Sequence, residues 1–185
     1  MIELTAPLDF PLAGCRVLMI DGPDGTGKTT YAKYVAHTFG AVYMHRSRPE
    51  PGTHWMAEHL DPVLDVLESG RKVVMDRGPV GNPIWTRLFD DPESALFADE
   101  PSYQWCMSTF CFLGARVELM FRSPEAIAQE LTSRGEPDHM VQAAVASVDE
   151  FYKAYETINK AIPVRLLSSD LVHQSIHNNT QGDIR

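Results

Sequence analysis

The 185-residue sequence lacks any apolar run that approaches the ~20 residues needed to cross a bilayer. Residues 1–7 also lack the basic start and the apolar stretch of a secretory signal peptide. Internal repeats and low-complexity blocks are absent as well. We therefore expect a cytoplasmic protein with no membrane partner. Residues 1–185 are expected to form one domain, with a core at about 16–167.

Cysteine and positive charge are both scarce. Three cysteines occur, at positions 15, 106 and 111, and this small and odd number does not suit a disulfide framework. Their apolar neighbours predict buried thiols. Lysine and arginine number 16 against 25 acidic residues, a net charge of −9, which argues against broad binding to nucleic-acid backbones. The arginines are nevertheless grouped, which suits a small anionic ligand.

The strongest pattern present is Gly22-Pro-Asp-Gly-Thr-Gly-Lys-Thr-Thr30, which fits the phosphate-binding loop G-x-x-x-x-G-K-S/T. Its glycines allow close approach of the backbone, and its N–H groups form an anion-binding nest. Lys28 is expected at the β- and γ-phosphates, and the Thr29 hydroxyl can ligate Mg²⁺. The predicted ATP-binding residues are Gly22, Asp24, Gly25, Thr26, Gly27, Lys28, Thr29 and Thr30.

Strand and helix patterns alternate along the chain. They predict an α/β fold: a three-layer P-loop NTPase fold with a five-stranded parallel sheet and helices on both faces. The expected strands are 16–21, 41–45, 72–76, 117–121 and 163–167. The expected helices are 28–39, 54–69, a segment that begins at 82, 102–113 (buried), 124–134 and 140–161. The polar tail 168–185 is expected to fray.

Element order and three motifs resemble the thymidylate-kinase-like branch of P-loop nucleoside and nucleotide kinases, most of all its divergent bacteriophage members. The motifs are the loop with its preceding Asp21, the pair Asp76-Arg77 after the third strand, and an arginine-bearing segment from Arg122 to Arg134. That segment resembles the family's lid, so residues 123–139 are expected to close over ATP. If a bacteriophage encodes the chain, its compartment is the host cytoplasm.

The resemblance implies catalytic roles. Asp76 lies at the carboxyl end of a parallel strand, where ligands bind in such sheets, and it either holds Mg²⁺ through water or takes the proton of an acceptor hydroxyl. Arg77 can hold an acceptor phosphate with its planar fork. Lys28, Arg122 and Arg134, with Arg116 as a further candidate, would stabilise transition-state charge. A turn cap, a structural ion pair and solvated surface charges are the corresponding structural alternatives.

The acceptor side is less conventional. Asp24 resembles the loop aspartate that binds the acceptor's sugar hydroxyl in these kinases, and Asp21 is expected to support the loop from below. Gly78-Pro79 replaces the family's aromatic residue or histidine, and Asn82 stands near a glutamate of the phage branch. The expected acceptor-binding residues are Asp24, Arg46, Arg48, Arg77, Asn82 and Trp85, with Trp105 as a second aromatic candidate.

The sequence therefore predicts an enzyme, an Mg²⁺-dependent kinase that transfers phosphate from ATP to a nucleotide or nucleoside. A dTMP-like deoxynucleoside monophosphate is the leading acceptor. One alternative is a phage-type kinase that phosphorylates a hydroxymethylated pyrimidine in DNA, which the acidic charge disfavours. Another is a non-kinase P-loop ATPase or a nucleotide-dependent switch. Whether the chain forms a homodimer is left open.

Overall fold

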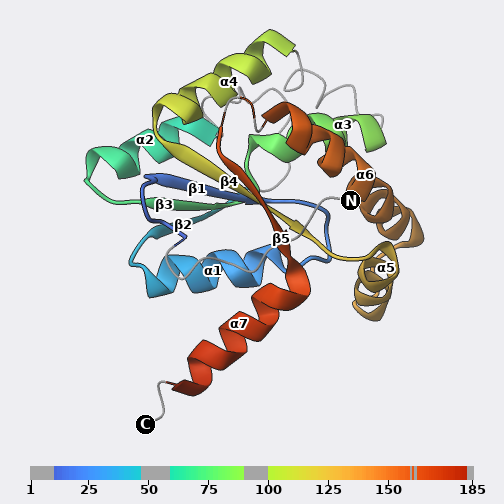
Figure 1. Cartoon of the computed structure of the whole chain (residues 1–185). Coiled ribbons are helices and arrows are strands. Elements are labelled where there is room, and N and C mark those ends of the chain that lie inside the picture. Colours follow the sequence, from blue (N-terminus) through green and yellow to red (C-terminus); the bar gives the residue numbers. More distant parts are fainter. Residues whose placement is uncertain (1–10, 47–58, 90–99, 159, 161, 183–185) are drawn as a thin grey trace.

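The computed structural model describes residues 11–46, 59–89, 100–158, 160 and 162–182, and the chain path is drawn in Figure 1. Five parallel strands form one sheet in the order β2-β3-β1-β4-β5. The strands are β1 (Val17–Asp21), β2 (Val42–His45), β3 (Val73–Asp76), β4 (Ala115–Phe121) and β5 (Val164–Ser168). The helices are α1 (Lys28–Thr38), α2 (Asp61–Glu68), α3 (Asn82–Phe89), α4 (Glu100–Phe112), α5 (Pro124–Ser133), α6 (Asp138–Ile158) and α7 (Ser169–Gly182). The predicted fold class is confirmed.

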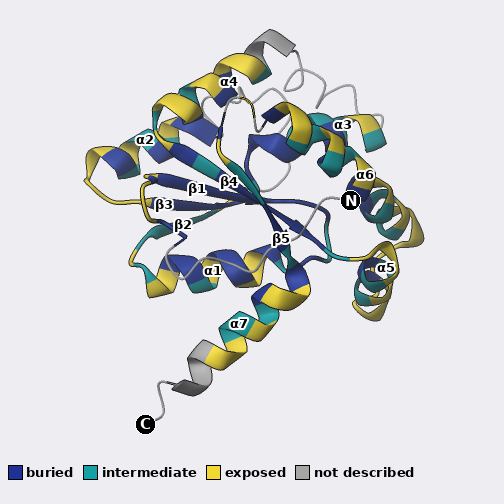
Figure 2. Cartoon of the chain, viewed as in Figure 1, coloured by how far each residue is buried: buried dark blue, intermediate teal, exposed yellow. Residues whose placement is uncertain are grey.

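Each face of the sheet carries its own apolar cluster, because successive side chains of a strand point to opposite faces. Leu18 and Ile20 of β1 pack with Tyr31 and Val35 of α1 and with Val172 of α7. Val17 and Met19 of β1 point to the opposite face, where they belong to one cluster with the helix residues Val63, Ile84, Phe110 and Phe151. Figures 1 and 2 show α1 below the sheet and α2, α3 and α4 above it, with buried strands between the two layers.

Strand and helix bounds agree closely with the sequence patterns, with three differences. The expected fraying tail is instead a helix, α7, because Val172 and Ile176 lie four residues apart and pack into the α1-side cluster. The helix expected at 54–69 is seen from Asp61 to Glu68, and residues 54–58 lie outside the described residues.

The third difference concerns α4, which was expected to be buried. Trp105 is 50% exposed and Phe112 is 90% exposed, and Cys111 lies on the surface. Cys15 and Cys106 are buried as expected, and burial raises the pKa of the Cys106 thiol to about 12. The helix is thus apolar all round in sequence although only one side of it faces the core. Within the described residues, we find no helix with the length and apolarity to cross a membrane.

Candidate active site

The phosphate-binding loop connects β1 to α1 at the centre of the sheet. β1 lies between β3 and β4, so the crossover connections diverge on either side of it, and ligands bind at such a switch point. Asp21, at the end of β1, is almost fully buried, and its carboxylate accepts hydrogen bonds from the N–H groups of Gly22 (3.0 Å), Gly78 (3.2 Å) and Gly81 (3.0 Å). Burial raises its pKa to about 6. As expected, Asp21 supports the loop from below.

The loop's glycines are required by close contacts. Gly22 has a φ of +131°, and a Cβ there would collide with the carbonyl oxygen of Met120 in β4. Gly27, at φ +81°, would place a Cβ 2.7 Å from Nε2 of His173 in α7. Ser169, the first residue of α7, donates its hydroxyl hydrogen to the carbonyl of Thr26 at 2.6 Å. The C-terminal helix is therefore part of the loop's support.

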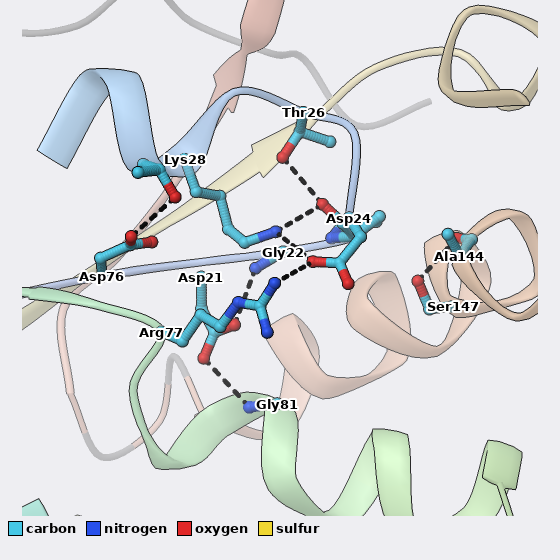
Figure 3. A network of polar contacts seen from close by, with 12 residues as sticks. Asp21, Gly22, Asp24, Thr26, Lys28, Asp76, Arg77, Gly81, Ala144 and Ser147 are labelled. Atoms are coloured by element: carbon cyan, nitrogen blue, oxygen red, sulfur yellow. Dashed lines mark hydrogen bonds and ion pairs between the residues drawn. The ribbon is translucent and has the colours of Figure 1, made fainter. Parts of the chain in front are cut away.

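Lys28 and Arg77 converge on one carboxylate oxygen of Asp24 (Figure 3). Lys28 Nζ lies 3.2 Å from Asp24 Oδ1 and donates to the carbonyl of Pro23 at 2.7 Å, while Arg77 Nη2 donates to the same Oδ1 at 2.9 Å. Burial alone would raise the pKa of Asp24, but the charges of Lys28 and Arg77 outweigh it and lower that pKa. Asp24 thus links the loop to the residue that follows β3.

Arg77 has a φ of +69°, the left-handed region that non-glycine residues seldom occupy. Its N–H donates to the carbonyl of Ile20 at 2.9 Å, and its guanidinium binds Asp24. These contacts hold a conformation that costs roughly 1–2 kcal/mol. Such strain is common at functional sites, where it aims a side chain.

Asp76, fully buried at the end of β3, is hydrogen-bonded through a single oxygen. Its Oδ2 accepts from the Thr29 hydroxyl (2.7 Å), the Tyr43 hydroxyl (2.8 Å) and His45 Nδ1 (2.8 Å). Its Oδ1 has no partner among the described residues. Thr29 gives its hydrogen to Asp76, so its oxygen lone pairs stay available to a cation. Thr29 and Asp76 therefore fit Mg²⁺, with Thr29 as ligand and Asp76 as the group that orients it.

The two arginines of the expected lid form ion pairs with carboxylates. Arg134 lies 2.6 Å from Glu130 of α5, and Arg122 lies 3.6 Å from Glu130 and 3.4 Å from Asp170 of α7. In α5 itself, Ile127 and Leu131 are buried, and both lie within 3.4 Å of the position that a Cβ on Gly25 would occupy. Helix α5 is thus packed directly on the loop.

Arg116 is not at this site, because it lies near the start of β4, beside Leu18, and donates to the carbonyls of Pro11 and Ala13. That candidate was wrong, because Arg116 lies at the end of the sheet opposite to the loop.

Three of the expected acceptor residues lie on the α2–α3 side. The backbone N–H of Arg46 donates to the carbonyl of Asp76 at 2.9 Å, and Asn82 is the first residue of α3. Trp85, one turn further, packs against Phe89 and Phe151 with ring centroids 5.8 and 6.1 Å apart. Arg48 lies outside the described residues. Trp105 is on the outward side of α4, half exposed.

Sequence reasoning missed Tyr43, His45 and His59. Tyr43 and His45 are two residues apart on β2 and therefore share one face of the strand. The parallel pairing of β2 with β3 places His45 beside Asp76. The position of β2 next to β3 follows from the strand order of the sheet, which cannot be read from a single sequence. His59 lies 2.9 Å from the Asn82 amide through Nε2, and it carried no motif at all.

Comparison with solved structures shows the fold. The YorR protein of Bacillus subtilis, crystallised with phosphorylated GDP, has a TM-score of 0.59 and 17% identity, covering 89% of this chain and 95% of that one. Deoxyadenosine kinase of M. mycoides with bound dATP has a TM-score of 0.56 and 14% identity, covering 91% and 98%. Polyphosphate kinase 2 of Arthrobacter aurescens TC1 has a TM-score of 0.52 and 17% identity, covering 83% and 61%.

Sequence comparison adds partial matches. UvrABC system protein A of Halalkalibacterium halodurans is 33% identical over 88 residues, and that of Bacillus subtilis (strain 168) is 31% identical over 86 residues. The matches cover 45% and 44% of this chain, which spans only 9% and 8% of those proteins. No protein-family model matches the chain. The chain therefore shares the fold of these P-loop kinases, while its sequence assigns it to no family.

Proposed function

We propose that this chain is an ATP-dependent phosphotransferase that acts on a nucleotide or nucleoside, with a dTMP-like deoxynucleoside monophosphate as the leading acceptor. The observation that carries the proposal is the shared contact of Lys28 and Arg77 with Asp24. An ATPase needs one loop cation for its phosphates. Here a second cation, on a strained residue after β3, stands beside the loop, where a second phosphate-bearing substrate would lie.

The roles of the residues follow from their positions. Lys28 leaves Asp24 for the donor's β- and γ-phosphates, and Arg77 leaves it for the acceptor's phosphate as a bidentate partner. Asp24 is then free to accept a hydrogen bond from the acceptor's sugar. Each substrate replaces one half of an existing ion pair, so neither cation is left unpaired in the empty site.

Asp76 would act on the reacting groups. Its Oδ2 orients Thr29, and its partnerless Oδ1 is the oxygen left to accept a hydrogen from the acceptor hydroxyl or from a bound water. When bound at Thr29, Mg²⁺ would neutralise developing phosphate charge. His45 and Tyr43 hold the carboxylate in place from β2.

The segment 123–139 is proposed as the lid that excludes water. Arg122 and Arg134 would exchange Glu130 and Asp170 for the oxygens of the transferring phosphoryl group, since a phosphate carries more negative charge than a single carboxylate and these ion pairs are at least partly open to solvent. Closure would direct the phosphoryl group to the acceptor instead of to water.

One screen tests this function. The chain is incubated with Mg²⁺ and γ-labelled ATP, and with deoxynucleoside monophosphates, nucleosides, DNA that contains 5-hydroxymethylpyrimidines, or no acceptor. We expect the label in a nucleoside diphosphate, and loss of that product in Lys28→Ala. Label in DNA would establish the DNA kinase instead, and label only in free phosphate would establish an ATPase.

A further inference from the structure

The outer side of α4 carries large apolar residues where a surface helix normally carries polar ones. Cys106, Met107 and Phe110 are buried and define the side of the helix that faces the core. With about 3.6 residues per turn, Trp105 and Phe112 lie on the opposite side. Their exposed fractions are 50% and 90%, and the outer side of α4 is exposed in Figure 2. An amphipathic surface helix turns its polar side outward, so this reversal indicates an interaction surface.

The same helix lies in the longest stretch of the sequence without a charged residue, positions 101–115. Gln104, Ser108 and Cys111, exposed around the two aromatic residues, are neutral as well. The whole chain, in contrast, has 25 acidic and 16 basic residues and a net charge of −9. A charged partner finds no counter-charge on this helix, and a second copy of so acidic a chain is repelled elsewhere on the surface. The absence of charge therefore favours an apolar partner, and it removes the main obstacle to a second copy.

We name Trp105, Ser108, Thr109 and Phe112 the α4 face. Its two aromatic residues are seven positions apart, about 10.5 Å along the helix axis, and Ser108 and Thr109 lie midway between them. If two copies pack antiparallel about a two-fold axis between Ser108 and Thr109, Trp105 of each copy meets Phe112 of the other. A two-fold interface requires such self-complementarity, because the same patch serves both copies.

The centre of the α4 face is suited to close contact between helices. Ser108 and Thr109 are small, so they leave the larger aromatic side chains to pack on either side of the axis. The Thr109 hydroxyl already donates to the carbonyl of Trp105 at 2.9 Å, so burial would leave its hydrogen paired. The face can therefore be covered at little cost in unsatisfied polar groups.

The size of the face sets the strength to expect. Aromatic side chains bury about 150–250 Å² each, so Trp105 and Phe112 together fall short of the roughly 800 Å² per partner of a standard interface. An association of micromolar strength fits this area. An unrelated protein would need an apolar ridge of matching spacing, which a second copy presents by symmetry.

We propose that the α4 face is the interface of a reversible homodimer in which α4 packs antiparallel against α4 of a second copy. The inference goes beyond the proposed function, and its test measures association and not phosphoryl transfer. A failure of one therefore leaves the other standing.

Sedimentation velocity between about 1 and about 100 µM tests the proposal, and we expect a monomer–dimer equilibrium for the wild type. Phe112→Glu and Trp105→Arg should each weaken the dimer at least about tenfold, because each change breaks both aromatic pairs. Leu171→Glu is the matched control, since Leu171 is an exposed apolar residue of another helix, α7, and its replacement should leave the dimer unchanged.

Mixing the two variants tests the antiparallel arrangement itself. A mixed dimer of Trp105→Arg with Phe112→Glu keeps one aromatic pair and sets the introduced arginine against the introduced glutamate. The mixture should therefore dimerise at least about tenfold more tightly than either variant alone. In a parallel arrangement neither aromatic pair would be restored, so mixing would bring no recovery.

Salt adds an independent readout. Raising the salt concentration from about 0.05 to about 0.5 M should tighten the wild-type dimer, because it screens the repulsion between two acidic chains without breaking ion pairs at the α4 face. Weakening by salt would indicate an ion-paired interface elsewhere and would overturn the proposal.

Three further results would also overturn it: a wild type that stays monomeric over the whole range, a dimer that Phe112→Glu leaves intact, and a mixture that shows no recovery. Phe112 is mostly exposed, so its replacement should not unfold the chain. Thermal unfolding of each variant confirms that its fold is retained.

Discussion

The loop side and the α2–α3 side of this site differ in how their polar groups are satisfied. At the loop, Lys28 and Arg77 both pair with Asp24, and Asp21 accepts three backbone hydrogen bonds. On the α2–α3 side, His59 and Arg46 each retain a buried donor with no partner in the described part of the chain. The loop region is thus paired within the chain, whereas the α2–α3 side keeps buried donors unpaired among the residues described. If the α2–α3 side holds the acceptor, as we propose, variants should lose phosphate binding and acceptor binding independently.

The largest expected effect comes from Lys28→Ala on the loop side. Removal of the cation should lower phosphoryl transfer by about 10³-fold or more, because its charge serves the donor phosphates in the transition state. The fold should persist, since Asp24 keeps Arg77 as a partner. Turnover of labelled ATP measures the effect, with Lys160→Ala, an exposed lysine, as the control. Near-native turnover would remove the loop from the mechanism.

Asp76 and Arg77 lie between the two regions, and their variants should differ in kind. Asp76→Asn removes the negative charge and replaces the free Oδ1 acceptor by an NH₂ donor, so kcat should fall by about 10²–10³-fold with little change in acceptor KM. Arg77→Ala should chiefly raise the acceptor KM, since a phosphate loses its bidentate partner. Steady-state kinetics separate the two, and Asp65→Asn on the exposed side of α2 serves as control. Identical profiles for both variants would contradict the assignment.

A smaller effect is expected from the lid. Arg134→Ala should lower kcat by about 10²-fold and leave ATP affinity nearly unchanged, because its charge acts mainly in the transition state. Hydrogen exchange over residues 123–139 should slow when ATP and acceptor are both bound. Arg87→Ala removes a comparable exposed ion pair on α3 and should leave kcat unaltered. Exchange that does not respond to ligands, with a normal kcat, would make α5 an ordinary surface helix.

The last expected effect is on stability and not on activity, and it arises on the α2–α3 side. Burial first, and the charge of Arg46 second, lower the pKa of His59 from 6.5 to about 4. A lowered folded-state pKa means that the unfolded chain binds the proton first. The stability due to neutral His59 is thus present above pH 6.5 and lost as the pH falls toward 4, by roughly 3 kcal/mol in all.

Urea unfolding at pH 7 and pH 4.5 measures this term, and His59→Gln should lose less stability on acidification than wild type. Asp21 acts in the opposite direction, since its pKa is raised to about 6 and its contribution declines as the pH rises from about 4 to 6. Because both proteins contain Asp21, their difference isolates His59. His37→Gln should follow the wild-type curve. A parallel loss in His59→Gln would show that this imidazole is not held neutral.

The contrast between the two regions also explains what could be foreseen. The loop, Thr29, Asp76 at the end of β3 and Arg77 after it were predicted because each depends on local backbone chemistry: glycines that a Cβ would block, and the carboxyl end of a parallel strand. The helix α7 and its hydrogen bond from Ser169 to Thr26, 143 residues away in sequence, were missed, since a tail with few apolar residues gains helical stability from tertiary packing.

By itself, then, the sequence determined the alternation of strands and helices, the phosphate loop and the position of Asp76-Arg77. These depend on period, on glycine geometry and on short-range order. The tertiary structure alone decided that Lys28 and Arg77 share Asp24, that Tyr43 and His45 hold Asp76, and that His59 reaches Asn82. Those contacts join segments 23 to 53 residues apart, apart from the local Asp24–Lys28 pair. They exist because strand order places the segments side by side, a decision made by the packing of the whole sheet.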